Sequence, residues 1–357
     1  MIRIYESADQ LDASAWDSMA GDVDVALSHA GLRLAEQTAG VEMRYVIATA
    51  DDGSWSGGLP VALATSASRW VLGRPDALLE RARREGEPGA GAVLERFGGS
   101  PEAVMPSLLV GGRHMGNSGI LLAEDAPAET AAALLAAADE LAAAFGARSS
   151  SAVFVGDGDG PLIGALEAAG YAPFGENRYS SMTLPSGGFD GWLATFAKKK
   201  RWKIRDERRR IASAGFRSRL VPLAEADLGR LAHLETQLLR KYGHEWKPEH
   251  SVPTFERVAA VFGSDAHVSI VERGSEVAGF VILLRLGSRW SARQVGFDYE
   301  AQGDLPLYFE TLFYAPVDSA HPLGIGRIDY GLGSEDAKVS RGCVAVTQRT
   351  WVKGQPT

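Results

Sequence analysis

The chain has little cysteine and no long apolar run. Its 357 residues contain one cysteine, Cys343, which excludes an internal disulfide and a multi-cysteine metal site. The most apolar stretch, 128–145, is rich in alanine and interrupted by three acidic residues, so we expect no membrane insertion. The first ten residues, MIRIYESADQ, lack the apolar core of an export signal, and we therefore expect a cytoplasmic protein.

The sequence also lacks the motifs of several enzyme classes. His244 and His250 do not have the interval of a zinc-binding helix, and the seven histidines show no other metal spacing. There is no Gly-x-Ser-x-Gly motif, and no glycine group follows a strand in the dinucleotide-binding or P-loop pattern. We expect no metal site and no tightly bound cofactor.

Charge is distributed unevenly along the chain. The formal net charge is −8, while residues 198–210 hold nine Lys or Arg and two acidic residues, a local charge of +7. The rest of the chain therefore carries −8 − 7 = −15. This balance argues against DNA binding, but it singles out one dense cationic helix.

That cationic segment predicts a phosphate-binding surface. Arg201, Arg205 and Arg208 fall on one side of a helix at spacings of four and three. Such a side can contact the phosphates of tRNA, a nucleotide-linked substrate or CoA, and its binding weakens as salt rises. A solvated helix side, partly neutralised by Asp206 and Glu207, is the alternative. The expected contact residues are Lys198, Arg201, Trp202, Arg205 and Arg208.

The C-terminal stretch 307–343 has a second distinctive pattern. It begins as a helix that we expect to be interrupted near Pro316, and a short strand follows at 327–330. A turn with Gly331 and Gly333 then leads to Lys338 and Arg341, two cations near a strand end. They are suited to a developing negative charge, and Arg341 to a phosphate or carboxylate. A surface turn with two solvated cations is the alternative.

This order of helix, strand, Gly-x-Gly turn and lysine resembles the C-terminal signature of the FemAB-like branch of the GNAT acyltransferase superfamily. The resemblance extends over most of the chain, because two helices, an antiparallel meander, a central helix and further strands are expected twice. It implies an α/β (α+β) fold of two tandem GNAT-like domains, each a mixed, mainly antiparallel sheet flanked by helices. We expect them at 1–184 and 185–357.

The resemblance also implies site residues. It suggests that Lys338 stabilises charge during transfer from aminoacyl-tRNA, and that the cationic helix holds a phosphate-bearing donor or acceptor. Attack requires a neutral amine and hence a base or a water chain, for which Asp298, Tyr308 and Tyr330 are candidates. Asp298 could equally be a turn residue. A pocket for the acceptor is expected at Tyr242, His244 and Glu245, for which a plain cluster at a helix end is the alternative.

The usual loop for acyl-CoA is not evident in either half. In the first half, Arg113-His114-Met115-Gly116-Asn117-Ser118 is close to the Arg-x-x-Gly-x-Gly pattern, but a strand is expected after it. In the second half, the corresponding segment 299–304 contains two acidic residues that would oppose a diphosphate.

These observations predict a FemAB-like transferase that forms an amide or ester on a small amine-type acceptor in cell-envelope or specialised-metabolite biosynthesis. Aminoacyl-tRNA is the expected co-substrate. An acyl-CoA-dependent N-acetyltransferase of the same fold is the first alternative. A GNAT-derived binding module without catalysis is the second.

Overall fold

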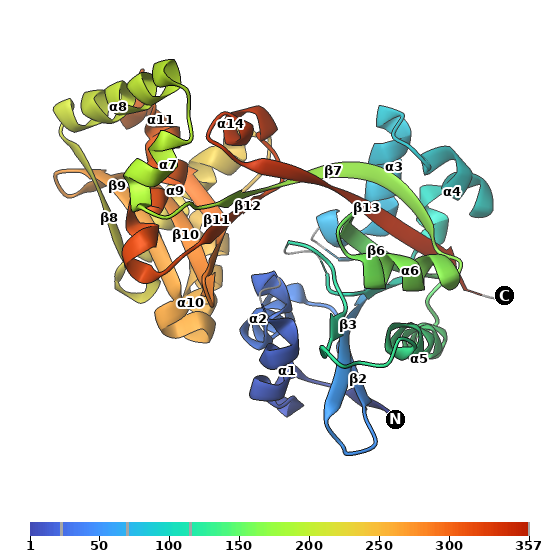
Figure 1. Ribbon diagram of the computed structural model, residues 1–357. Helices are drawn as coiled ribbons and strands as arrows, with labels where there is room; N and C mark the ends of the chain where they lie inside the picture. Colours follow the sequence, from blue (N-terminus) through green and yellow to red (C-terminus); the bar gives the residue numbers. More distant parts are fainter. Residues whose placement is uncertain (22–23, 69–70, 114–115, 356–357) are drawn as a thin grey trace. The chain divides into compact units, whose positions relative to one another are not determined.

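The computed structural model describes residues 1–21, 24–68, 71–113 and 116–355 and divides the chain into two compact units. Unit 1 comprises Met1–Tyr179 and Val346–Thr357, and unit 2 comprises Ser180–Ala345. The chain passes between the units inside two strands, β7 (Ala172–Thr183) and β13 (Val344–Gly354) (Figure 1). The division is thus not the linear one expected from the sequence, since the C-terminal residues belong to unit 1.

Unit 1 is built on a sheet in the order β1-β2-β3-β4-β6-β13, with the short β5 paired to β3. Its strands are antiparallel except for β4 and β6, which are parallel and are connected through the crossover helix α5. The strands are β1 (Ile2–Tyr5), β2 (Met43–Thr49), β3 (Trp55–Ala64), β4 (Ser107–Val110), β5 (Leu121–Leu122) and β6 (Ser149–Gly156). The helices are α1 (Ala13–Ala20), α2 (His29–Ala39), α3 (Pro75–Glu85), α4 (Ala90–Arg96), α5 (Thr130–Ala144) and α6 (Gly160–Ala168).

Unit 2 contains the strand order β7-β12-β11-β10-β9-β8, in which β11 and β12 are parallel and the other pairs are antiparallel. The strands are β8 (Phe216–Pro222), β9 (Ala266–Arg273), β10 (Glu276–Leu286), β11 (Arg289–Phe297) and β12 (Arg327–Gly331). The helices are α7 (Gly188–Ala194), α8 (Lys198–Ser213), α9 (Leu228–Lys241), α10 (Pro248–Phe262), α11 (Tyr299–Gln302), α12 (Leu307–Phe309), α13 (Ala315–Ala320) and α14 (Glu335–Val339).

The two sheets repeat one topology. Four antiparallel strands, a helical crossover and a parallel strand follow one another as β1–β4, α5 and β6 in unit 1, and as β8–β11, α11–α13 and β12 in unit 2. The next strand in each sheet comes from elsewhere in the sequence. Residues 180–183 of β7 pair with β12, and β13 pairs with β6. This exchange explains why the C-terminus belongs to unit 1.

Each unit has its own apolar core. In unit 1, α5 packs on β2, β3 and β4 through residues such as Leu134 and Ala138. In unit 2, the core surrounds Trp290, Phe313 and Ile328. Helix α9 approaches β11 very closely at Gly296, where an added Cβ would lie 2.5 Å from the Glu235 backbone nitrogen.

Candidate functional site

Helix α8 carries the dense cationic segment and is anchored by a narrow buried stripe. Only Ile204, Glu207 and Ile211 are buried, at the i, i+3 and i+7 spacing of one helix face. A carboxylate therefore lies in the middle of the stripe that docks an otherwise basic helix. The lysines and arginines of this helix are all exposed or half-buried.

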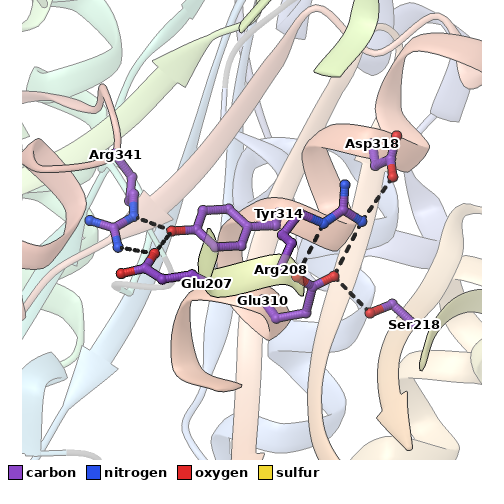
Figure 2. A network of polar contacts seen from close by, with 7 residues as sticks. All are labelled: Glu207, Arg208, Ser218, Glu310, Tyr314, Asp318 and Arg341. Carbon is purple, nitrogen blue, oxygen red and sulfur yellow. Dashed lines mark hydrogen bonds and ion pairs between the residues drawn. The ribbon is translucent and has the colours of Figure 1, made fainter. Parts of the chain in front are cut away.

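Glu207 forms the first of two polar networks between α8 and the C-terminal part of unit 2 (Figure 2). Arg341 is 1% exposed, and its Nη2 donates to Glu207 Oε2 at 2.9 Å while its Nε donates to the Tyr314 hydroxyl at 2.7 Å. Tyr314 in turn donates to Glu207. The Arg341 Cζ atom lies 3.5 Å from the centre of the Phe309 ring.

This network leaves Arg341 without the role expected from the sequence. Its third nitrogen, Nη1, donates to Ser340 Oγ at 2.8 Å, so all three guanidinium nitrogens have partners within the protein. Burial, followed by the hydrogen bond to Glu207, raises the pKa of Tyr314, which keeps the phenol protonated as a donor. Arg341 is thus a structural cation and not a free clamp for a phosphate or carboxylate.

The second network is centred on Arg208, the next residue of α8. Its Nε lies 3.3 Å from Glu310 Oε2, and its Nη2 donates to Asp318 Oδ2 at 3.0 Å. Ser218 Oγ donates to the other oxygen of Glu310 at 2.9 Å, and the guanidinium lies 4.5 Å from the Phe189 ring centre. Glu310 is 3% exposed, and burial raises its pKa despite the nearby Arg208. Figure 2 shows the two networks on either side of the Tyr314 side chain.

Both networks depend on an irregular helical turn. Glu310 and Tyr314 are the first and last residues of a π-helical turn, Glu310–Tyr314, between α12 and α13. The expected interruption near Pro316 is therefore not a break, because the chain remains helical through Pro316 in α13. The irregularity precedes the proline, which lacks the N–H of a regular helix. This turn lets the side chains of Glu310 and Tyr314 both reach α8.

An open groove of about 570 Å³ lies beside the second network, between α8, β8 and α13. Arg205, Arg209 and Arg217 are all exposed. Arg209 forms an ion pair with Asp206, and Arg217 forms one with Glu272. Four arginines and two carboxylates line the groove, a balance of 4 − 2 = +2. The charged lining residues are Arg205, Arg208, Arg209, Arg217, Glu310 and Asp318.

Not all of the expected phosphate contacts face this groove. Arg205 and Arg208 line it, while Lys198, Arg201 and Trp202 are outside its lining. The Arg201 Nη1 donates to the Phe196 carbonyl at 2.7 Å and so fixes the start of the helix. Trp202 is 64% exposed, which leaves a flat aromatic surface open to solvent.

Lys338 is buried against the glycine turn that precedes it. Its ammonium donates to the carbonyls of Tyr330 and Gly331 at 2.8 Å each, and of Leu332 at 2.7 Å. The residue is 5% exposed, and burial lowers its pKa to about 8. Three N–H groups and three acceptors are matched, so Lys338 fixes the turn between β12 and α14.

Tyr330 and Tyr308 lie next to this turn and the π turn. The Tyr330 ring centre lies 4.7 Å from that of Phe313, and its buried hydroxyl has no hydrogen-bond partner among the residues that the structure describes. The Tyr308 ring centre lies 6.2 Å from that of Phe313. Burial raises the pKa of both tyrosines above the ordinary value, so both phenols are protonated at neutral pH. The structure thus brings Tyr308, Tyr330, Lys338 and Arg341 together, but neither tyrosine is poised as a base.

Asp298 has structural partners. It is the N-cap of α11, where its Oδ1 accepts from the Ala301 amide at 2.9 Å, and its Oδ2 accepts from Arg230 Nη2 at 2.7 Å. Burial acts to raise its pKa, but the Ala301 amide and Arg230 outweigh this effect and lower the pKa. The structure therefore favours the turn-residue interpretation over a catalytic base.

The expected acceptor cluster is at the exposed end of α9. Tyr242, His244 and Glu245 are all exposed, in agreement with a helix-end cluster. The sequence reasoning missed a carboxylate earlier on the same helix, Glu235, which accepts from Ser251 Oγ. Burial raises the pKa of Glu235 to about 7.

Sequence reasoning also missed Glu207, Glu310 and Tyr314. For Glu207 a signal was present, since it falls three residues after Ile204 and four before Ile211 on the apolar stripe. For Glu310 and Tyr314 there was none, because a π turn changes which residues share a helix face.

In both units, a backbone amide in the segment after the fourth strand of the meander donates a hydrogen bond to an aspartate of the protein. In unit 1, the Asn117 amide donates to Asp24 Oδ2 at 3.0 Å, and Asp24 also accepts from the Tyr179 hydroxyl at 3.0 Å. In unit 2, Asp298 holds the Ala301 amide. Of the expected loop 113–118, His114 and Met115 lie outside the described residues. The described amides of Asn117 and Ala301 already have an anionic acceptor.

Comparisons with known proteins agree with this fold. A family model named FemAB_like, described as peptidoglycan biosynthesis/recognition, matches residues 113–353. The chain is similar to the crystal structure of FemX, with a TM-score of 0.65 and 13% identity over 97% of this chain and 96% of that one. No curated protein sequence matches the chain.

Two further solved structures share the architecture. A tandem GNAT protein from the clavulanic acid biosynthesis pathway superposes with a TM-score of 0.56 at 12% identity, covering 100% of this chain and 99% of that chain. The structure of L-PGS from Bacillus licheniformis has a TM-score of 0.53 at 13% identity, and the match covers 87% of this chain and 83% of that chain. These similarities confirm the predicted fold of two tandem GNAT-like domains.

Within the described ranges, no helix has the length and apolar character needed to span a bilayer. The same ranges contain no group of three or more His, Cys, Asp or Glu side chains arranged to hold a metal. The family match covers more than half of the chain, in agreement with the repeated topology and the C-terminal lysine turn. The chain therefore belongs to the FemAB-like family and is an acyltransferase of the GNAT fold.

Proposed function

We propose that this protein is an aminoacyltransferase of peptidoglycan-related metabolism, which uses aminoacyl-tRNA to form an amide on a small amine-type acceptor. The observation that carries the proposal is the FemAB-like match over residues 113–353, together with the similarity in fold to FemX across 97% of the chain. Charged tRNA is a cytoplasmic substrate, and we place the reaction in that compartment.

The groove of unit 2 supports a phosphate-bearing donor. Its lining has a positive balance, and Arg205 projects from α8 without the carboxylate partners that hold Arg208. A guanidinium that remains hydrated and mobile can accept a phosphate at little cost. We assign Arg205 to the donor's backbone, with Lys198, Arg201 and the exposed ring of Trp202 extending that surface along the same helix.

The reaction needs positioning and charge stabilisation. The acceptor nitrogen attacks the ester carbonyl carbon, a C–N bond forms, and the C–O bond to the tRNA ribose breaks. The proton lost by the amine ends on the departing ribose oxygen. We propose that the Lys338 charge offsets the oxyanion through space while its three N–H groups hold the turn. Tyr308 is assigned to the substrate-contacting surface beside it.

The hydrogen bonds from the Asn117 and Ala301 amides to aspartates of the protein argue against acyl-CoA as the donor. A diphosphate would compete with Asp24 for the Asn117 amide in unit 1, and with Asp298 for the Ala301 amide in unit 2. Displacing either carboxylate would bring like charges together, which is unfavourable.

A donor screen tests the proposal. Purified protein is incubated with an amine mixture and either a pool of charged tRNAs or a panel of acyl-CoAs, and products are identified by mass spectrometry. We expect amide products only with charged tRNA, and their loss after RNase treatment. Products formed from acyl-CoA in the presence of RNase would refute the tRNA assignment.

Matched variants test the residue roles. Arg205→Gln should raise the KM for charged tRNA with little change in kcat, and more so at low salt. Arg84→Gln, at an exposed arginine of α3, is the control and should change neither. Lys338→Met should lower kcat, whereas a non-catalytic binding module would keep its ligand affinity and show no turnover in any variant.

A further inference from the structure

The segment that connects α9 to α10, residues 242–247, is fastened to unit 2 at Trp246, and we call it the strap. The Trp246 Nε1 donates to Ser251 Oγ at 2.8 Å, and Ser251 Oγ donates to Glu235 Oε2. Arg240 Nε donates to the Trp246 carbonyl at 3.1 Å. A serine hydroxyl has one hydrogen to give, so this chain of hydrogen bonds runs in one direction and ends at the Glu235 carboxyl group.

Glu235 is a largely buried acid whose charge is not offset. It lies where α9 packs on β11, and its backbone nitrogen is 2.5 Å from the position of a Cβ added at Gly296. Burial raises its pKa from the ordinary 4.5 to about 7, and the hydrogen bond from Ser251 offsets this only in part. Among the residues that the structure describes, no cation forms an ion pair with Glu235. Its ionised form is therefore unfavourable while the strap is fastened.

The charged groups of the surrounding elements leave Glu235 unpaired. On α9, Arg230 is held by Asp298, Lys241 lies over the Tyr299 ring and His233 is exposed. On β10 and β11, Glu276 is exposed, Arg285 donates to the Gly287 carbonyl and Arg289 pairs with Asp329. The titratable side chains of the strap and of α10 are exposed: His244, Glu245, Lys247, Glu249, His250, Glu256 and Arg257. None of these groups, nor Arg293 of β11, is among the causes of the Glu235 pKa shift.

We propose that the strap is a conformational switch, which the hydrogen bonds from Trp246 through Ser251 to Glu235 hold closed while Glu235 is protonated, and which ionisation of Glu235 releases. Release lets water reach the carboxylate and so removes the cost of its burial. The strap carries Tyr242, and His244 and Glu245 follow it, so release moves the cluster that the sequence predicts for the acceptor. Its effect on transfer rests on the proposed function, whereas the switch itself does not.

The direction of the switch with pH follows from the raised pKa of Glu235. A carboxyl group with a raised pKa favours the closed strap fully below about pH 4.5, and this preference is lost as the pH rises to about 7. Within that window each pH unit increases the ratio of open to closed strap about tenfold. Above about pH 7 the ratio no longer changes, because Glu235 is then ionised in both states.

Hydrogen exchange of the full chain tests the switch. Exchange of the amides of residues 242–247 is followed by mass spectrometry from about pH 5 to about pH 9, and each rate is divided by the intrinsic rate at that pH. In the wild type we expect the corrected rate to rise about tenfold per unit up to about pH 7 and then to level off. A corrected rate that does not depend on pH would overturn the proposal.

Three substitutions assign the effect to the chain of hydrogen bonds. Glu235→Gln keeps an acceptor for Ser251 without a charge, and its strap should stay protected at every pH, with exchange at pH 8 at least about tenfold slower than in the wild type. Ser251→Ala cuts the chain, and its strap should exchange fast at every pH. Glu256→Gln, at an exposed acid of α10, is the matched control and should follow the wild type.

Two results would contradict the switch: a pH dependence that persists in Glu235→Gln, or a Ser251→Ala strap that is as protected as that of the wild type. The exchange measurement needs no donor or acceptor. A failed donor screen with an intact pH response would therefore refute the proposed function alone, and active transfer with no pH response would refute the switch alone.

Discussion

Arg113 of unit 1 and Arg341 of unit 2 are both buried arginines, yet their surroundings differ completely. Arg341 donates to Glu207, Tyr314 and Ser340 and stacks on Phe309. Arg113 has no such partner among the described residues and borders an apolar cavity. Lys338, a third buried cation, is matched to three backbone carbonyls. Burial alone therefore does not reveal what a charge does, whereas its partners do.

The comparison separates structure from binding. A cation whose nitrogens all have partners within the protein stabilises the fold, and it can act on a ligand only through its charge and not through a hydrogen bond. A cation whose donors are unmatched destabilises the free protein and is available for a ligand. The following substitutions test this distinction, beginning with the largest expected effect.

Arg341→Met should lower the free energy of unfolding by about 3–5 kcal/mol, because it removes the buried partner of the Glu207 carboxylate and leaves only the exposed Lys203 ammonium, 3.8 Å away, as a counter-charge. Urea-induced unfolding followed by tryptophan fluorescence measures the change. The double variant Arg341→Met with Glu207→Leu should recover much of the loss. If the single substitution instead stabilised the protein, the pair of Arg341 and Glu207 would not be a stabilising one.

Lys338→Met should cost about 1–3 kcal/mol, since the carbonyls of Tyr330, Gly331 and Leu332 lose their donor. The pH dependence gives an independent check. The pKa of Lys338 is lowered to about 8, so between pH 8 and 10.5 the unfolded chain binds more protons than the folded one. The wild type should gain stability from this group across that window, and Lys338→Met should lack the gain.

Glu235→Gln extends the comparison to buried acids. Glu207 is held by Arg341, whereas the hydroxyl of Ser251 is the donor to Glu235, whose pKa is raised to about 7. In the window from about 4.5 to 7 the folded state binds more protons, so wild-type stability should fall as pH rises. The variant should be more stable than the wild type by about 1–2 kcal/mol at pH 8 and not at pH 4. Equal profiles for the two proteins would refute the assignment.

Asp298→Ala should have the smallest effect, about 1 kcal/mol, through loss of the α11 N-cap. Asp298→Asn keeps an acceptor for the Ala301 amide but loses the charge facing Arg230, and we expect less than half of that cost. Transfer activity should persist in Asp298→Asn. A loss of turnover without loss of stability would restore Asp298 as a candidate base.

Local patterns in the sequence were sufficient for several features. The run of cations at 198–210 predicts the basic helix, which forms as α8. The Gly-x-Gly turn after a short strand predicts the approach of Lys338 to the strand end, which the structure shows as three hydrogen bonds to residues 330–332. The repeated order of helices and strands predicts two GNAT-like sheets, because hydrophobic periodicity and turn residues act over short distances.

Other features depend on contacts between distant segments. The ion pair between Arg341 and Glu207 joins residues that lie 134 positions apart in the sequence. The π turn that brings Tyr314 to this pair has no signature in a single sequence. The hydrogen bond from the Asn117 amide to Asp24 likewise joins residues that lie 93 positions apart. Charge and residue type are set by the chain itself, but whether a charge is matched or left free depends on tertiary packing. Packing brings the partner from elsewhere or, as at Arg113 within the described residues, does not supply one.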